Sequence, residues 1–168
     1  MPVYLFTFHG YRTWMPDHRR GCTQRKKGYL PTDPKMARDY KRRAKRSETT
    51  FDEALSRALL AELIDLCPKI SCRLHAGTVE LTHVHALVSW KHVRGWMSVR
   101  KSLKTSLAKR LKTVGDDVSL SRGGSRKHVE DKDHFEYLMQ TYLPRHVGVA
   151  WYEDRGWVVQ RGKRRRKG

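Results

Sequence analysis

The segment 80–90, ELTHVHALVSW, constrains the fold of this chain more than any other stretch. In an extended strand successive side chains point to opposite faces, so His83 and His85 share one face and Val84, Ala86 and Val88 share the other. Two imidazoles at neighbouring positions of one face can bind a single metal ion together. They can also be structural hydrogen-bonding groups on a half-buried strand, and this segment alone leaves both readings open.

The charge of the chain indicates a polyanionic partner. The 168 residues contain 36 Lys and Arg against 17 Asp and Glu, a formal net charge of +19. Such an excess opposes folding by self-repulsion, so we expect it to serve binding. Nucleic acid is the first candidate partner and an anionic membrane surface the second.

The length and the cysteines set further bounds. We predict one domain over residues 1–160 and a basic, disordered tail over 161–168. The three cysteines are an odd number without Cys-x-x-Cys spacing, which argues against a disulfide scaffold or a zinc ribbon and for a reducing compartment. No apolar run approaches the ~20 residues that span a membrane, and the N-terminus lacks signal-peptide features. The sequence therefore predicts a cytoplasmic protein with no membrane association.

Hydrophobic periodicity predicts a mixed α+β fold. Alternating patterns indicate strands, and apolar residues at helical spacing indicate amphipathic helices. We expect Thr50 and Glu53 to form a capping box at the start of the first helix, and a bulge near Gly77. The expected strands cover 3–11, 71–81, 83–90 and 126–130, the expected helices 51–66, 94–113 and 133–142, and a last hairpin 147–153 with 156–160.

This order of elements is βαββαβ with an added helix, the pattern of a ferredoxin-like antiparallel sheet. Both main helices are expected to cover one face of the sheet. The other face is then open and carries the histidine pair.

The last predicted helix offers partners for the histidines. On an α-helix, Gln140 and Thr141 lie three and four residues beyond Tyr137 and share its face. Tyr142 is five residues beyond Tyr137 and points away from it, so we expect it to pack. Tyr137 with Gln140 or Thr141 is thus a coherent set for a nucleophile and a further metal ligand, although a tyrosine on an amphipathic helix is more often a core residue.

The motif His83-Val84-His85-Ala86-Leu87-Val88 resembles the histidine–hydrophobe–histidine motif of the HUH endonucleases. More narrowly, the chain resembles the REP-associated tyrosine transposases, in the single-tyrosine transposase group of that superfamily. In these proteins the motif is followed by a helix, a basic strand and a helix with the nucleophilic tyrosine, here within His134-Phe135-Glu136-Tyr137. The resemblance covers about 3–11 and 51–148.

The resemblance implies a role for each of these residues. His83 and His85 would hold a divalent cation, Mg²⁺ or Mn²⁺, beside the scissile phosphate. Tyr137 would attack the phosphorus of single-stranded DNA, giving a 5′-phosphotyrosine bond and a free 3′-hydroxyl. The family places an Asn, Gln or His ligand four residues after the tyrosine; Thr141 stands there, so we predict Gln140, one residue earlier, as the third ligand. The family motif usually begins Pro-Asp or Pro-Glu, where this chain has Leu81-Thr82.

The basic residues are consistent with single-stranded DNA that contains hairpins as the partner of this chain. Phosphate contacts give affinity without sequence choice. The predicted contacts are Arg100, Lys104, Arg126, Lys127, Arg164 and Arg165.

The sequence thus predicts a metal-dependent single-stranded DNA endonuclease and transposase, monomeric or homodimeric, near the nucleoid. A non-catalytic nucleic-acid-binding module on the same fold and a hydrolytic metal-dependent nuclease are the alternatives. Only the transposase forms a covalent protein–DNA adduct.

Overall fold

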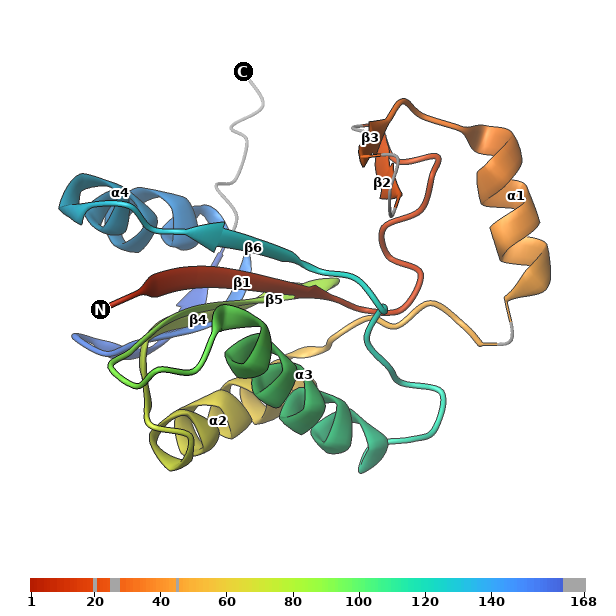
Figure 1. Ribbon diagram of the computed structural model, residues 1–168. Helices are drawn as coiled ribbons and strands as arrows, with labels where there is room; N and C mark the ends of the chain where they lie inside the picture. The colour runs from red at the N-terminus through yellow and green to blue at the C-terminus, as the bar shows by residue number, and fades with distance from the viewer. Residues whose placement is uncertain (20, 25–27, 45, 162–168) are drawn as a thin grey trace, which may run out of the picture.

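The computed structural model describes residues 1–19, 21–24, 28–44 and 46–161 (Figure 1). Strands and helices both occur along its whole length. In chain order they are β1 (Val3–His9), β2 (Cys22–Gln24), β3 (Gly28–Leu30), α1 (Pro34–Arg43), α2 (Glu53–Lys69), β4 (Cys72–Val79), β5 (His83–Trp90), α3 (Trp96–Lys112), β6 (Ser125–His128), α4 (Lys132–Tyr137), a π-helical turn η1 (Leu138–Tyr142), a 3₁₀ turn η2 (Leu143–Arg145), β7 (Gly148–Tyr152) and β8 (Gly156–Gln160).

The main sheet is antiparallel and has the strand order β6-β1-β5-β4-β7-β8. The neighbouring strands β6, β1, β5 and β4, with α2 and α3 as their connections, form the expected βαββαβ unit. β7 and β8 extend this unit beyond β4. The predicted hairpin therefore joins the main sheet, because β7 pairs with β4 from Ala76 to Val79.

Helices α2 and α3 cover one face of the sheet, as expected (Figure 1). The apolar face of each strand explains this packing. On β1, Phe6 and Phe8 are fully buried against the helices, and Val84, Ala86 and Val88 contribute the same face of β5. Burial of each large apolar side chain of this kind contributes about 1.5–3 kcal/mol.

The opposite face is not open, in contrast to the sequence-based expectation. α4 and the turns that follow it lie over this face, on the other side of the sheet from α2 and α3 (Figure 1). Leu138 and Leu143 pack there against Leu5 and Leu87 of the sheet. The segment that carries the predicted nucleophile thus forms the second layer over the histidine-bearing face.

The described residues between β1 and α2 form a separate layer beside the end of β1. The described part contains the short β2–β3 pair and α1 (Figure 1). The side chain of Asp33 caps α1 by accepting a hydrogen bond from the Met36 N–H. An ion pair from Lys41 to Asp17, 2.9 Å long, ties α1 back to the loop after β1.

Two local predictions need correction. The N-cap of α2 is Asp52, which accepts a hydrogen bond from the Leu55 N–H at 2.8 Å, so Thr50 lies outside the helix. The irregularity in β4 falls at His75, between Leu74 and Ala76, rather than near Gly77. Among the described residues, no helix is long and apolar enough to cross a bilayer.

The link from η2 to β7 depends on Gly148. Its φ of +148° lies in a region that L side chains rarely adopt, and an added Cβ would lie 2.1 Å from the Val79 carbonyl oxygen. We therefore expect Gly148→Ala to lower the free energy of unfolding by about 2–3 kcal/mol. Gly156→Ala is the control: with a φ of +71° and no atom within 4 Å, it should cost about 1 kcal/mol. Urea unfolding measures both, and equal losses would contradict the assigned clash.

Candidate metal and nucleophile site

Strand β5 places the histidine pair on the face under α4 and the turns that follow it. Cross-strand pairing with β1 sets His9 opposite His83 and Thr7 opposite His85. The rings of His83 and His85 lie 4.8 Å apart, centroid to centroid. The two imidazoles therefore share one face, as the alternation of the strand predicted.

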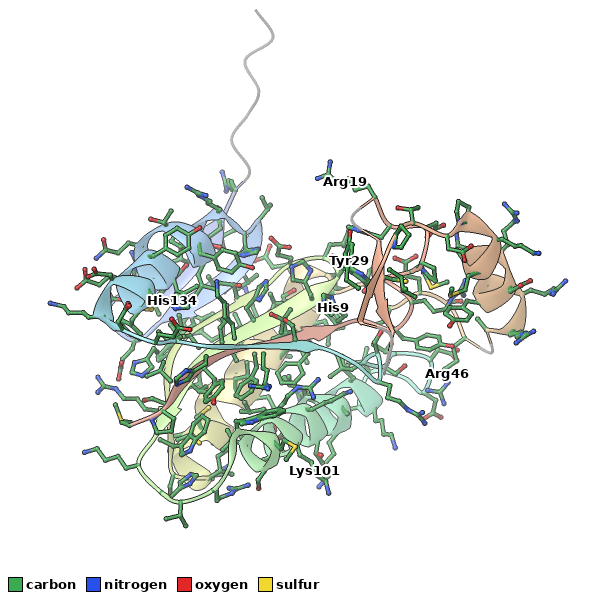
Figure 2. All side chains as sticks on the ribbon, turned by 45° about the horizontal axis from the view of Figure 1, so that its top comes forward. His9, Arg19, Tyr29, Arg46, Lys101 and His134 are labelled. Carbon is green, nitrogen blue, oxygen red and sulfur yellow. The ribbon has the colours of Figure 1, made fainter. Side chains whose placement is uncertain are left out.

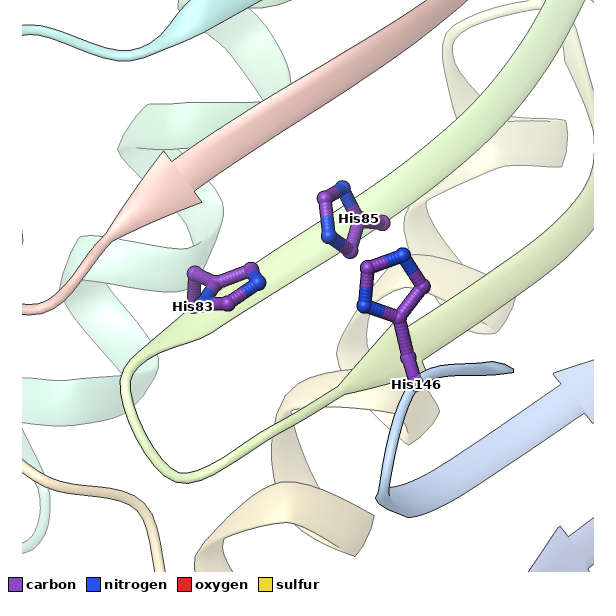
Figure 3. Close-up of side chains that lie close together, drawn as sticks. All are labelled: His83, His85 and His146. Carbon is purple, nitrogen blue, oxygen red and sulfur yellow. The ribbon is translucent and has the colours of Figure 1, made fainter. Parts of the chain in front are cut away.

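A third histidine, His146, completes the cluster from the segment between η2 and β7. Figure 3 shows its ring turned toward His83 and His85. The ring centroids of His146 and His85 are 4.4 Å apart. One ligand nitrogen from each of the three histidines lies within 4.8 Å of the other two, so the cluster could hold a metal ion.

Hydrogen bonds at Nδ1 orient two of these rings. Nδ1 of His85 lies 2.9 Å from the Thr7 hydroxyl, and Nδ1 of His146 lies 2.6 Å from a carboxylate oxygen of Glu80. Since a carboxylate only accepts, Nδ1 of His146 donates to Glu80, which leaves Nε2 as the ring nitrogen that can face an ion. Within the described chain, Nε2 of both His85 and His146 is buried without a hydrogen-bond partner.

Glu80 also contacts the third ring. Its second carboxylate oxygen lies 2.8 Å from Nε2 of His83, while Nδ1 of that ring lies 3.0 Å from the Thr82 hydroxyl. Burial favours the neutral carboxyl, but hydrogen bonds from His146 and His83 outweigh burial and hold the pKa of Glu80 well below its ordinary value. Glu80 is therefore an ionised bridge between two of the three histidines. For Nε2 of His83 to ligate an ion, this one contact must open.

Burial keeps His85 neutral. Loss of solvent, and then the nearby His146 and His83, lower the pKa of His85 well below its ordinary value. A neutral imidazole is the form that ligates a metal. Nitrogen ligands held at about 2.0–2.1 Å from one ion lie roughly 3–3.4 Å apart, so the cluster needs only a small contraction. Two buried, unpartnered ring nitrogens and a neutral ring thus fit a resident cation.

Glu80→Gln should weaken binding of Mn²⁺ by about 10- to 100-fold, because partners of this kind fix the ligand's tautomer and basicity. The amide keeps the size of the side chain and removes its charge. Calorimetric titration with Mn²⁺ measures the affinity. Glu130→Gln, at an exposed position, is the control. Unchanged Mn²⁺ affinity in Glu80→Gln would contradict a role for Glu80 in orienting the metal ligands.

The turn that follows α4 changes which tyrosine reaches the histidines. Leu138–Tyr142 is π-helical, with i→i+5 hydrogen bonding. Residues five apart therefore come together, and the rings of Tyr137 and Tyr142 lie 6.4 Å apart. The expectation that Tyr142 points away from Tyr137 assumed α-helical phase and is wrong.

Tyr142 lies against the histidine cluster. Its ring centroid is 4.8 Å from that of His146 and 5.9 Å from that of His85. Tyr137 is 45% exposed, and its ring contacts Tyr142, which lies between Tyr137 and the histidines. Gln140, the predicted third ligand, is exposed in the π-helical turn.

Of the four predicted DNA contacts that lie in the described part of the chain, three are away from this face. Arg100 and Lys104 are on α3, across the sheet, and hold the loop before β6: Lys104 Nζ lies 2.6 Å from the carbonyl oxygens of Ser121 and Arg122. Arg126 stacks over Trp96 at 3.8 Å, on the same side. Lys127 pairs with Leu5 and so shares the histidine-bearing face. Arg164 and Arg165 lie outside the described residues.

His9 gives the site a pH signature. Burial, and then His83 and His18, lower the pKa of His9 to about 4. The unfolded chain therefore binds more protons than the folded chain below pH 6.5, so this contribution to stability is complete above pH 6.5 and is lost as the pH falls toward 4. We expect the unfolding free energy to fall over this window, and to fall less steeply in His9→Gln. Urea titrations at each pH test this, and identical slopes would contradict it.

Comparisons with known proteins identify little. No family model matches the sequence, and no curated protein matches it. Among solved structures, the fold is similar to one described as a REP-associated tyrosine transposase bound to a REP hairpin, with a TM-score of 0.44 and 9% identity. The match covers 86% of this chain and 64% of the other, so this chain spans less than two thirds of that protein's length.

Proposed function

We propose that this chain is a metal-dependent single-stranded DNA endonuclease and strand transferase, as in transposition, with Tyr142 as its nucleophile. The observation that supports the proposal most is the position of the Tyr142 ring beside His85 and His146, the two histidines whose Nε2 atoms are buried without partners among the described residues. A nucleophile next to a group of imidazoles that can ligate a metal ion is the arrangement that metal-assisted attack on a phosphate needs.

Tyr142 replaces Tyr137 in this proposal for two reasons. It contacts the histidines, whereas Tyr137 contacts Tyr142. His146 also follows Tyr142 by four residues, the spacing that the resemblance to the single-tyrosine transposases implies for the third ligand. His146 accordingly replaces Gln140 as the proposed ligand beside His83 and His85.

In the proposed reaction Oη of Tyr142 attacks the scissile phosphorus. A new bond joins phosphorus to the tyrosine oxygen, and the bond from phosphorus to the 3′ oxygen breaks. The phenol gives up one proton and the departing 3′ oxygen takes up one, so the products are a 5′-phosphotyrosine and a 3′-hydroxyl. One phosphodiester replaces another, and a second 3′ end can reverse the step without an external energy source.

The histidines are the proposed metal ligands, and Glu80 orients two of them. His83, His85 and His146 would bind the cation, which when bound places positive charge beside the phosphate oxygens. Of Mg²⁺ and Mn²⁺ we propose Mn²⁺, because Mg²⁺ prefers oxygen ligands and imidazole suits first-row transition metals. The net charge of +19 favours a nucleic-acid substrate, and we expect the protein to act on DNA in the cytoplasm, as a monomer or homodimer.

A denaturing gel tests the proposal. End-labelled DNA hairpins with single-stranded flanks are incubated with the protein and Mn²⁺, and with EDTA as the control. The proposal expects cleavage together with a slow-migrating, protease-sensitive adduct, both lost in EDTA. Metal-dependent cleavage without adduct would indicate a hydrolytic nuclease. Tight binding with neither product, over a broad set of hairpins, would indicate a binding module.

A further inference from the structure

A pocket of about 330 Å³ lies between the loop after β1, the end of α1 and the loop before β6. Its volume is at the lower end of the range for small-ligand sites. Aromatic rings and guanidinium groups dominate its lining. They belong to Tyr11, Trp14, Tyr40, Arg12, Arg43 and Arg122.

The main chain joins this pocket to the end of β1. The N–H of Tyr11 donates to the Ser119 carbonyl at 2.8 Å, and the N–H of Ser121 donates to the His9 carbonyl at 2.8 Å. The Ser121 hydroxyl adds a hydrogen bond to the Gly10 carbonyl at 2.9 Å. The loop before β6 is therefore fixed to the same strand end that carries His9, next to the histidine cluster.

Ring contacts connect the pocket with that cluster. The centroid of Trp14 lies 5.5 Å from His9, and His9 lies 5.5 Å from His83. Figure 2 shows His9 where β1 approaches the β2–β3–α1 layer. Trp14 is 43% exposed and stacks on His18 at 4.0 Å. Consecutive nucleotides of an extended strand are about 7 Å apart, roughly twice the 3.4 Å rise per nucleotide of a stacked strand. Since two ring-to-ring distances of 5.5 Å separate Trp14 from His83, the pocket is within one or two nucleotides of the cluster.

The pocket is also strongly cationic. Among the described residues, Arg12, Arg43 and Arg122 make no ion pair, and the lining contains no acidic side chain. Arg12 has a φ of +64°, a strained conformation for a residue with a side chain. Its Nη1 donates to the Arg46 carbonyl, while its Nε is buried without a partner in the described chain. The aromatic rings therefore lie among three guanidinium groups, one of which has an N–H without a hydrogen-bond partner in the described chain.

We propose that this pocket binds an unpaired nucleotide of the DNA strand beside the attacked phosphate, with the base against Trp14 and the phosphate among the arginines. The proposal rests on the proposed function for its ligand, single-stranded DNA. Aromatic rings stack on any base, and arginines pair with phosphate, which together form a sequence-tolerant subsite for single strands.

Binding without metal separates this subsite from catalysis. The probes are fluorescein-labelled dT12 and an abasic 12-mer with the same number of phosphates, measured by anisotropy in EDTA. Loss of one stacking contact predicts that Trp14→Ala weakens dT12 binding roughly 5- to 30-fold and abasic binding less than 2-fold. Trp14→Phe should stay close to wild type. Trp157→Ala, at 44% exposure on β8, is the matched control and should change neither.

Three results would overturn the subsite: unchanged dT12 affinity in Trp14→Ala, equal losses for both probes, or an equal loss in Trp14→Phe. The adduct assay on the same proteins keeps the two proposals apart. An adduct in wild type with unchanged dT12 affinity in Trp14→Ala overturns the subsite and leaves the proposed function. Base-dependent loss in Trp14→Ala, with no adduct from any hairpin, supports the subsite and counts against the tyrosine mechanism.

Discussion

Tyr142→Phe is expected to abolish the covalent protein–DNA adduct, with a fall in Mn²⁺-dependent cleavage of at least about 1000-fold. Phenylalanine keeps the ring that packs beside His146 and His85 and removes only the attacking oxygen. Folding and metal binding should therefore be retained. Denaturing gels with end-labelled hairpins measure the adduct, and calorimetric titration with Mn²⁺ measures the metal site.

Tyr137→Phe is the matched control, on the same segment and with the same loss of one hydroxyl. It should keep the adduct and most of the rate. If the adduct persists in Tyr142→Phe and disappears in Tyr137→Phe, then Tyr137 is the nucleophile, as the resemblance to the tyrosine transposases implied. If cleavage survives in both variants, the reaction uses water.

His146→Ala is expected to lower Mn²⁺ affinity by at least about 100-fold, more than the loss expected for a supporting residue. The reason is that His146 supplies one of three imidazoles whose ligand atoms lie within 4.8 Å of one another. Cleavage should be lost in parallel. Calorimetry measures the affinity, and thermal unfolding without metal checks that the variant is folded.

Gln140→Ala provides the comparison for this loss. Gln140 is exposed in the π-helical turn, so its truncation should leave Mn²⁺ affinity within about 2-fold, as for ordinary surface substitutions. The reverse pattern, with affinity lost in Gln140→Ala and kept in His146→Ala, would require the turn to rearrange around the ion. That outcome would return the third ligand to the residue that the sequence predicted.

Much of the fold was predictable because it depends on local periodicity. Alternation along β5 placed the histidine pair on the face opposite the helices, and the structure has Phe6 and Phe8 of β1 on the helix side. Helical spacing likewise identified α2 and α3. The pairing of β7 with β4 was not predictable in this way, since a short strand carries no signal for which sheet edge it joins.

Sequence reasoning did not bring His146 into the candidate site, and the reason is physical. A π-helical turn inserts one residue relative to an α-helix, and the sequence Leu138–Tyr142 carries no clear signal for it. The α-helical assumption grouped Tyr137 with Gln140 and Thr141, and the resemblance implied Tyr137 as the nucleophile. One signal in the sequence does point to His146: the spacing of four residues applies equally from Tyr142 to His146, beyond Pro144, where no helix was expected.

The predicted DNA contacts illustrate a limit of reasoning from charge. Lys104 has its ammonium among main-chain carbonyls, and burial lowers its pKa. Arg126 is stacked on Trp96. Composition revealed that the chain is cationic, but only the tertiary structure distinguishes a charge that holds a loop from one that faces the histidine cluster.

Mapping the DNA-linked residue tests the central claim most directly. After reaction with a hairpin and Mn²⁺, nuclease and trypsin digestion leave a nucleotide on the peptide Asp133–Arg145, which contains both Tyr137 and Tyr142. Fragmentation in a mass spectrometer then distinguishes the two positions. We expect a nucleotide linked through its 5′-phosphate to Tyr142. A phosphonucleotide on Tyr137, or cleaved DNA with no modified peptide, would contradict it.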